Sequence, residues 1–332
     1  MKSTAGTQQL TEKVREFYFD KRSINMIVRE LGRSLEKKFK GCLDSVLVYG
    51  SNSTGAKTDS LIDFILLTND HKRFFARFLE HFSLNPSRSL RNLAYVALGY
   101  NKLCYHLKSF EKEPNIYMAY EGDKKDSVGY KFNVVRTDTW QREMGGSRED
   151  WYWFGRFMKI TPVLSMREEL EEPFVQAVSG AIRTGFETAL ILAANEKIEA
   201  DSEEVNRHGS IVLENEEIMR YYMNLSYICD RRVEPDDKWK KLLAQNPEAY
   251  AAFFAVCLNE MRKKEIVSLP TGSSGRTGIL LEPEEVKKRA AHIYSTLFEQ
   301  RASFAGHNRS NVWTNIFWPE YCLAKIGRWR QG

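Results

Sequence analysis

Two short aliphatic runs near the start of the chain constrain its fold most. Residues 45–49 read SVLVY and residues 62–67 read IDFILL, and the segment between them is rich in Gly, Ser, Asn, Thr and Asp. β-Branched and aliphatic runs of this length, separated by turn-forming residues, predict two neighbouring β-strands. The first run ends in Tyr49-Gly50-Ser51 and the second opens with Ile62-Asp63, so polar groups are expected at adjacent strand ends.

The segments around these strands predict an α+β region over residues 1–140. Apolar residues between Leu10 and Phe39 recur at three- and four-residue steps, which indicates one or two amphipathic helices. Residues 70–82 return to helical spacing, and residues 115–120 and 130–136 have the composition of further strands.

After Trp140 the pattern becomes helical, so we predict a second, helical domain over residues 141–265. Its expected helices cover residues 151–159, 174–195, 216–227, 235–244 and 249–264. A third region, residues 266–332, comprises the Gly/Ser-rich stretch LPTGSSGRTG and a basic, aromatic C-terminal segment. The stretch predicts a loop or linker, from which Arg276 could close over a substrate or lipid.

Charge and cysteine content exclude some classes of function. The chain of 332 residues has a net charge of +5, which suits an anionic partner but not a dedicated DNA-binding protein, so we expect no nucleic-acid partner. Its five cysteines form no C-x-x-C pair, which indicates a reducing compartment and no structural zinc. The N-terminus lacks the apolar core of a secretory signal. The most apolar stretch, residues 177–194, contains Arg183 and Glu187, so no membrane-spanning helix is expected.

The polar groups at the two strand ends are typical of nucleotidyl transfer. A Gly-Ser turn at Gly50-Ser51, after Tyr49, lets backbone N–H groups approach a triphosphate. A carboxylate on the next strand, Asp63, could hold Mg²⁺ against the phosphates. On spacing alone, an ordinary turn and a surface aspartate are the more frequent explanation.

Further candidates are cationic. Lys131 stands on a predicted strand where polymerase-like enzymes often place a third acid, although a solvated strand lysine is the more frequent explanation for such a residue. Arg156 and Lys159 are three residues apart and would share a helix face, as a phosphate clamp or as an ordinary basic surface. Asp230 and Arg232 could form a metal or phosphate pair, or a local ion pair.

Several strings together resemble one known family. They are VYGSNSTGAKTDSLIDFILLTND, LNPSRSL, YKFNVV, WFGRFMKITPV and NLSYICDRRVEPDDKWKKLL, in an order and spacing similar to those of the mitochondrial and bacterial phosphatidate cytidylyltransferases, the Tam41 family. The resemblance covers residues 45–245 and recurs weakly in the tail. It implies a nucleotidyltransferase (polymerase-beta-like) core, a winged-helix-like second domain and a C-terminal helix.

The resemblance also implies an activity, CTP + phosphatidate → CDP-diacylglycerol + pyrophosphate, with Mg²⁺ as cofactor. Asp63 and Lys131 would be catalytic, with Asp63 the metal ligand. The expected nucleotide-binding residues are Tyr49, Gly50, Ser51, Arg156, Lys159, Asp230 and Arg232. The nucleophile would be a phosphate oxygen that is already ionised at neutral pH, so no strong general base is required.

The tail from residue 308 combines aromatic and basic side chains, which is typical of a segment in a membrane interface. The residues expected to contact lipid are Arg276, Trp313, Trp318, Lys325, Arg328 and Trp329. Alternatively, the tail is a helix docked on the body with its aromatics in the core. The expected location is peripheral, on the cytoplasmic face of the cell membrane or the matrix face of the mitochondrial inner membrane.

Two other functions remain open at the level of sequence. One is a nucleotidyltransferase that acts on a protein or small-molecule hydroxyl, which would need a carboxylate on the strand that holds Lys131. The other is a membrane-associated assembly factor without catalytic activity.

Overall fold

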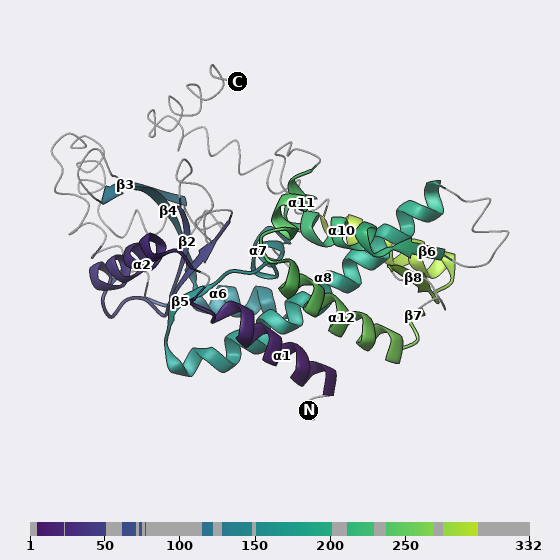
Figure 1. Ribbon diagram of the computed structural model, residues 1–332, viewed down its shortest axis with the longest axis horizontal. Helices are drawn as coiled ribbons and strands as arrows, with labels where there is room; N and C mark the ends of the chain where they lie inside the picture. The colour runs from purple at the N-terminus through teal and green to yellow at the C-terminus, as the bar shows by residue number, and fades with distance from the viewer. Residues whose placement is uncertain are drawn as a thin grey trace, which may run out of the picture.

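The protein is a mixed α+β structure with a helical majority, here described from a computed structural model (Figure 1). A five-stranded sheet lies at one end of the molecule and a small three-stranded sheet at the other, with helices between them. The structure describes residues 5–22, 24–50, 62–70, 73–74, 77, 115–121, 128–147, 151–200, 211–228, 237–268 and 275–297.

The helices in the described residues are α1 (Ala5–Tyr18), α2 (Met26–Lys38), α6 (Thr137–Arg142), α7 (Trp151–Phe157), α8 (Glu168–Ala200), α10 (Asn215–Ile228), α11 (Lys238–Leu243) and α12 (Pro247–Lys263). A π-helical segment, η2 (Glu143–Ser147), follows α6, and residues 283–297 form a further helix. The strands are β1 (Ser45–Tyr49), β2 (Ile62–Thr68), β3 (Asn115–Glu121), β4 (Val128–Arg136), β5 (Val163–Met166), β6 (Ile211–Glu214), β7 (Val267–Ser268) and β8 (Arg276–Ile279).

The larger sheet has the strand order β3-β4-β2-β1-β5. β1 and β2 are antiparallel, β2 and β4 are parallel, and both edge strands pair antiparallel with their neighbours. The register places Tyr49 opposite Asp63 and Asp63 opposite Lys131. The end of β1 and the start of β2 therefore lie side by side at the same end of the sheet.

The two faces of this sheet belong to two different hydrophobic cores. Successive side chains of a strand point to opposite faces, so neighbouring residues pack into different cores. Val46, Phe64 and Phe132 pack with α2 on one face. Leu47 and Ile65, each one position along, pack instead with the helices. Because this second core continues from the sheet into the helical part, it crosses the domain boundary expected at residue 140.

The helical part is organised around α8. Helix α1 packs against α8 and α12, although it precedes the sheet in the sequence. Its buried residues Leu10, Val14 and Tyr18 join the helical core. Three glutamates in the first turn of α8 complement the positive end of its helix dipole.

The pattern over residues 10–39, which predicted one or two helices, forms two, α1 and α2, and the second is capped by Asn25, which accepts a hydrogen bond from the Ile27 N–H. Other elements differ from the predicted ones. The helix expected over residues 151–159 ends at Phe157. Strand β5 and the sheet β6-β8-β7 were not predicted, because strands of two to four residues carry little periodic signal. Most of the helix expected over residues 70–82 lies outside the described residues.

Within the described residues, α8 alone has the length and hydropathy of a possible membrane span. Most of its apolar window is buried inside the protein, where α1, α10 and α12 cover it. The apolar composition of α8 is therefore that of a core helix.

Candidate functional site

The site begins at the corner where β1 ends and β2 starts. Gly50 has a φ of +87°, in the left-handed region that favours glycine. A Cβ atom at this position would lie 3.3 Å from Asp63 Oδ2, closer than ordinary van der Waals contact. Glycine therefore permits both the turn and the close approach of the carboxylate, which is half-buried.

The neighbouring strand β4 brings two more polar residues to this corner. The backbone of Lys131 is in register with Asp63. Lys131 is the residue that the sequence places where polymerase-like enzymes often have a third acid. Two residues along, Asn133 is buried and its Nδ2 donates to Tyr49 Oη at 3.0 Å. Among the described residues, no group donates to Asn133 Oδ1, which is itself buried.

Helix α7 carries a guanidinium to the same corner. The Arg156 guanidinium carbon lies 4.9 Å from the centre of the Tyr49 ring, in a cation–π contact. This contact joins WFGRFMK to the end of the first strand. A positive charge thus stands beside the Gly50 turn and the Asp63 carboxylate.

Lys159 does not share a helix face with Arg156, because α7 ends at Phe157 and Lys159 lies in the turn that follows. It is also not a solvated surface lysine, since only 9% of the residue is exposed. Its Nζ donates to Ser226 Oγ at 2.6 Å and lies 4.2 Å from the centre of the Tyr227 ring.

The turn that presents Lys159 is held by tyrosines from three helices. Tyr18 Oη of α1 lies 2.9 Å from the Lys159 carbonyl oxygen, and Tyr222 Oη of α10 donates to Met158 O at 2.7 Å. Tyr250 Oη of α12 accepts from the Ile160 N–H at 3.2 Å. Burial raises the pKa of all three hydroxyls above the ordinary tyrosine value. Long-range contacts therefore set the backbone position of Lys159.

The two motifs WFGRFMK and NLSYICD meet through a close helix contact. A Cβ atom on Gly155 would lie 2.6 Å from the Ser226 backbone nitrogen, so only glycine allows α7 and α10 to approach this closely. The contact places Ser226 next to Lys159.

Several predicted site residues lie outside the described residues: Ser51, Asp230, Arg232, Trp313, Trp318, Lys325, Arg328 and Trp329. Arg276 does not lie in a loop, as the sequence predicted, but is the first residue of strand β8. It pairs with Glu214 of β6, with Nε 2.7 Å from Oε1. Cross-strand pairing of opposite charges stabilises this end of the small sheet.

The carboxylates at the corner decide what kind of magnesium site the described residues can form. Among the described residues, no group of three or more His, Cys, Asp or Glu side chains could hold a metal. Mg²⁺, however, is commonly bound through one or two carboxylates with substrate phosphates and water as its other ligands. Asp63, next to a glycine that leaves room against its Oδ2, fits a site of that kind.

Sequence reasoning missed the contribution of Asn133, Ser226, Tyr227 and Lys238. Asn133 could have been found, since it lies two residues after Lys131 and therefore on the same face of the strand. Ser226 and Tyr227 stand in the motif SYICDRR but carried no assigned role. Lys238 gave no local signal, because its position depends on how α11 packs beside α10.

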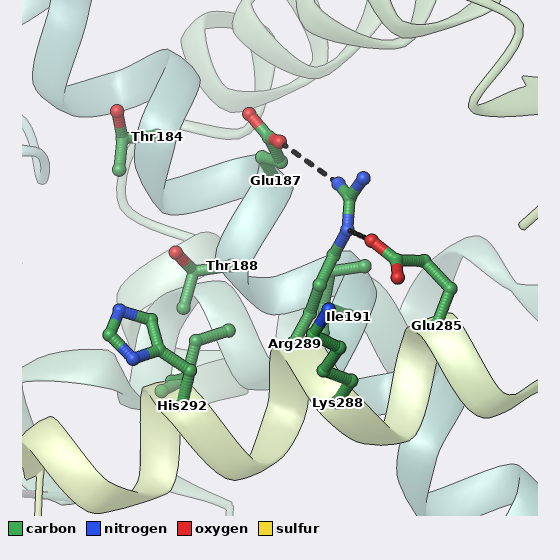
Figure 2. A pocket seen from close by; sticks show the side chains of 9 residues that line it. Thr184, Glu187, Thr188, Ile191, Glu285, Lys288, Arg289 and His292 are labelled. Atoms are coloured by element: carbon green, nitrogen blue, oxygen red, sulfur yellow. Dashed lines mark hydrogen bonds and ion pairs between the residues drawn. The ribbon is translucent and has the colours of Figure 1, made fainter.

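A separate cavity of about 330 Å³ lies between α8 and the helix over residues 283–297. Figure 2 shows Arg289 at its wall, paired with Glu285 and Glu187. The Arg289 Nε lies 2.8 Å from Glu285 Oε1, and its Nη1 lies 3.8 Å from Glu187 Oε1. Because these carboxylates balance the guanidinium charge, the cavity offers no pronounced attraction for an anion.

Comparison with known protein families and with curated proteins found no match. A solved structure to which the chain is similar is a nucleotidyltransferase-like protein from Exiguobacterium sibiricum, with 8% sequence identity over 81% of this chain and 89% of that chain and a TM-score of 0.24. A likeness at this level establishes neither a family nor a function.

Proposed function

We propose that the protein is a nucleotidyltransferase that joins a nucleotide to an acceptor bearing a phosphate group. The observation that carries the proposal is the corner of the large sheet, where Asp63 lies opposite Tyr49 on an antiparallel strand and beside the Gly50 turn. A backbone turn open to phosphates and an adjacent carboxylate are the parts that nucleotidyl transfer requires.

Strand β4 favours a phosphate over a hydroxyl as the attacking group. A hydroxyl acceptor would need a base, for which the expected place is the strand that holds Lys131. That strand reads VGYKFNVVR and contains no Asp or Glu. An ionised phosphate needs no base, and a lysine in register with Asp63 suits an acceptor that is itself anionic.

In its most specific form, the proposed reaction uses CTP and phosphatidate. A phosphatidate oxygen forms a bond to the α-phosphorus of CTP, the bond from that phosphorus to the bridging oxygen of the β-phosphate breaks, and pyrophosphate leaves. The support for these two substrates is the resemblance to the phosphatidate cytidylyltransferases, carried by the strings around Gly50, Asp63, Arg156 and Ser226.

Asp63 would hold Mg²⁺ in this site, and the ion would supply neutralisation of the phosphate charges. The chain's own cations add to this effect. Arg156, beside Tyr49, and Lys159, in the turn after α7, would bind phosphate oxygens and orient the triphosphate. Burial strengthens such contacts, because the effective dielectric constant is lower than in water.

The proposal includes a membrane surface as partner, since phosphatidate and its product remain in a bilayer. The basic and aromatic residues after position 308 would dock the protein peripherally, on the cytoplasmic face of the cell membrane or the matrix face of the mitochondrial inner membrane. A chain truncated before residue 308 should bind CTP normally but no longer sediment with phosphatidate-containing liposomes.

The direct test is incubation of the full chain with CTP, Mg²⁺ and phosphatidate in detergent, with lipid-linked CDP and pyrophosphate as the measured products. Parallel reactions contain ATP in place of CTP, or diacylglycerol in place of phosphatidate. We expect product only with CTP and phosphatidate. Transfer to diacylglycerol would contradict the phosphate acceptor, and equal use of ATP would contradict the cytidine preference.

A further inference from the structure

Two lysines from separate elements converge on one aromatic ring beside the candidate site. Lys159 Nζ lies 4.2 Å from the centre of the Tyr227 ring, and Lys238 Nζ lies 4.5 Å from the same centre. Lys159 comes from the turn after α7, Tyr227 from the end of α10 and Lys238 from the start of α11. The two ammonium groups therefore cannot be farther apart than the sum of these distances.

We infer that Lys159, Tyr227 and Lys238 form a phosphate-binding subsite, with Lys238 as a ligand-contacting residue. A lysine ammonium donates charge-assisted hydrogen bonds to phosphate oxygens, and such bonds are stronger than those between neutral groups. The Tyr227 ring stabilises each cation through a cation–π contact. Phosphate, with several acceptor oxygens, can bind both ammonium groups at once.

Burial and hydrogen bonding indicate a positioned site. Lys159 is 9% exposed and Ser226 is 1% exposed, and Lys159 donates to Ser226 Oγ at 2.6 Å. In that bond the serine oxygen is the acceptor, so its own hydroxyl proton can be donated to a phosphate oxygen. The tyrosine contacts to residues 157–160 hold the turn that carries Lys159, which lowers the entropy lost when a ligand binds.

The subsite is joined to the sheet corner. Lys159 is three residues from Arg156, whose guanidinium stacks on Tyr49, and Tyr49 is in register with Asp63. A row of cationic groups thus extends from the Gly50 turn toward α11. The inference rests on the proposed function for the molecule that carries the phosphate, which is either the triphosphate of the nucleotide or the phosphomonoester of the acceptor.

The test compares two lysines on the same short helix. Lys238→Met removes the charge next to Tyr227 and retains the length of the side chain. Lys241→Met is the matched control, because it removes the same charge from an exposed lysine whose Nζ lies 2.7 Å from Asp237. Titration calorimetry on the full chain would use inorganic pyrophosphate, CTP and a short-chain phosphatidate in detergent as probes, with thermal unfolding as a check that each variant is folded.

We expect Lys238→Met to weaken the binding of at least one probe by about tenfold, as for the loss of one charge-assisted contact, and Lys241→Met to change it less than about twofold. Weakening for pyrophosphate and CTP alone assigns the subsite to the triphosphate, and weakening for phosphatidate alone assigns it to the acceptor. The inference is overturned if the Lys238→Met protein binds all three probes as the wild type does, or if Lys241→Met weakens them equally.

The two proposals fail separately. Lys238-dependent binding without formation of lipid-linked CDP would contradict the proposed function and leave the subsite in place. Formation of lipid-linked CDP together with unchanged probe binding by the Lys238→Met variant would support the proposed function and contradict the subsite.

Discussion

At the scale of single residues, the carboxylate of Asp63 is the group on which the proposed chemistry depends most. It stands at the start of β2, in register with both Tyr49 and Lys131. Asp63→Asn retains the shape of the side chain but removes its charge. We expect it to lower kcat by at least about 10³-fold, since a lost charge contact in phosphoryl chemistry costs several kcal/mol.

The measurement is lipid-linked CDP formed per enzyme, with circular dichroism to show that the variant is folded. Asp70→Asn is the matched control, because Asp70 lies beyond the other end of β2 and its Oδ1 accepts from the Arg73 N–H, a bond that asparagine can also accept. Near-normal turnover by folded Asp63→Asn would contradict the assignment.

Gly50 tests the shape of the same corner. Gly50→Ala should cost about 1–2 kcal/mol of unfolding free energy, because an L-residue is strained at positive φ. It should also reduce activity, since the new Cβ would press on Asp63 Oδ2 at 3.3 Å. Gly275→Ala separates the two effects, because Gly275 has a φ of +97° but nothing within 4 Å of an added Cβ. If both variants lose stability equally and neither loses activity, Gly50 serves only the turn.

At the scale of elements, the approach of α7 to α10 decides where the cations of the site stand. Gly155→Ala would place a Cβ 2.6 Å from the Ser226 nitrogen, and backbone cannot yield as a flexible side chain does. We expect a loss of about 2 kcal/mol in unfolding free energy from this overpacking. We also expect weaker phosphate binding, because the contact between Lys159 and Ser226 depends on the same spacing.

Urea unfolding and pyrophosphate calorimetry measure the two effects. The control is Gly180→Ala, at a helical glycine of α8 where an added Cβ meets nothing within 4 Å. Alanine should stabilise that helix by up to about 1 kcal/mol, so the two substitutions should have opposite signs. A stable Gly155→Ala protein would show that the helices can separate at no cost.

At the scale of the whole molecule, one face of the large sheet shares a core with the helical part. Residues 1–140 alone would lack α8 and α12, which cover Leu10, Val14 and Tyr18 of α1. The apolar sheet face at Leu47 would also be uncovered. We expect this fragment to lack a cooperative thermal transition, whereas the full chain unfolds in one. A sharp transition in the fragment would instead support an independent N-terminal domain.

The buried tyrosines predict a stability that falls in alkali. Burial raises the pKa of Tyr18, Tyr222 and Tyr250 in the folded protein, while in the unfolded chain each ionises near pH 10. Their contribution is therefore complete below pH 10 and is lost as the pH rises through the raised values. Between pH 10 and its own raised pKa, each tyrosine should lower the unfolding free energy by about 1.4 kcal/mol per pH unit.

Urea unfolding between pH 8 and pH 11.5 measures this slope. Tyr222→Phe should make it shallower by one tyrosine's share, although it lowers stability at pH 8 by about 1–3 kcal/mol, because Met158 O loses its buried donor. An unchanged slope in this variant would show that Tyr222 already ionises at its ordinary pKa when folded.

The sequence by itself determined the elements whose signal is local. The strands β1 and β2 follow from runs of aliphatic residues, and the turn after Tyr49 follows from Gly50, so local pattern alone places Asp63 at the start of a strand. Short strands such as β5 and β8 could not be predicted, because they depend on the partners they pair with.

Only the tertiary structure decided which distant residues meet. The placement of α1 against α12, the contact of Arg156 with Tyr49 and the convergence of Lys159 and Lys238 on Tyr227 join segments far apart in the chain. Periodicity and turn chemistry report on neighbours within a few residues. The free energy that brings these segments together comes instead from apolar burial across elements, which no local pattern records.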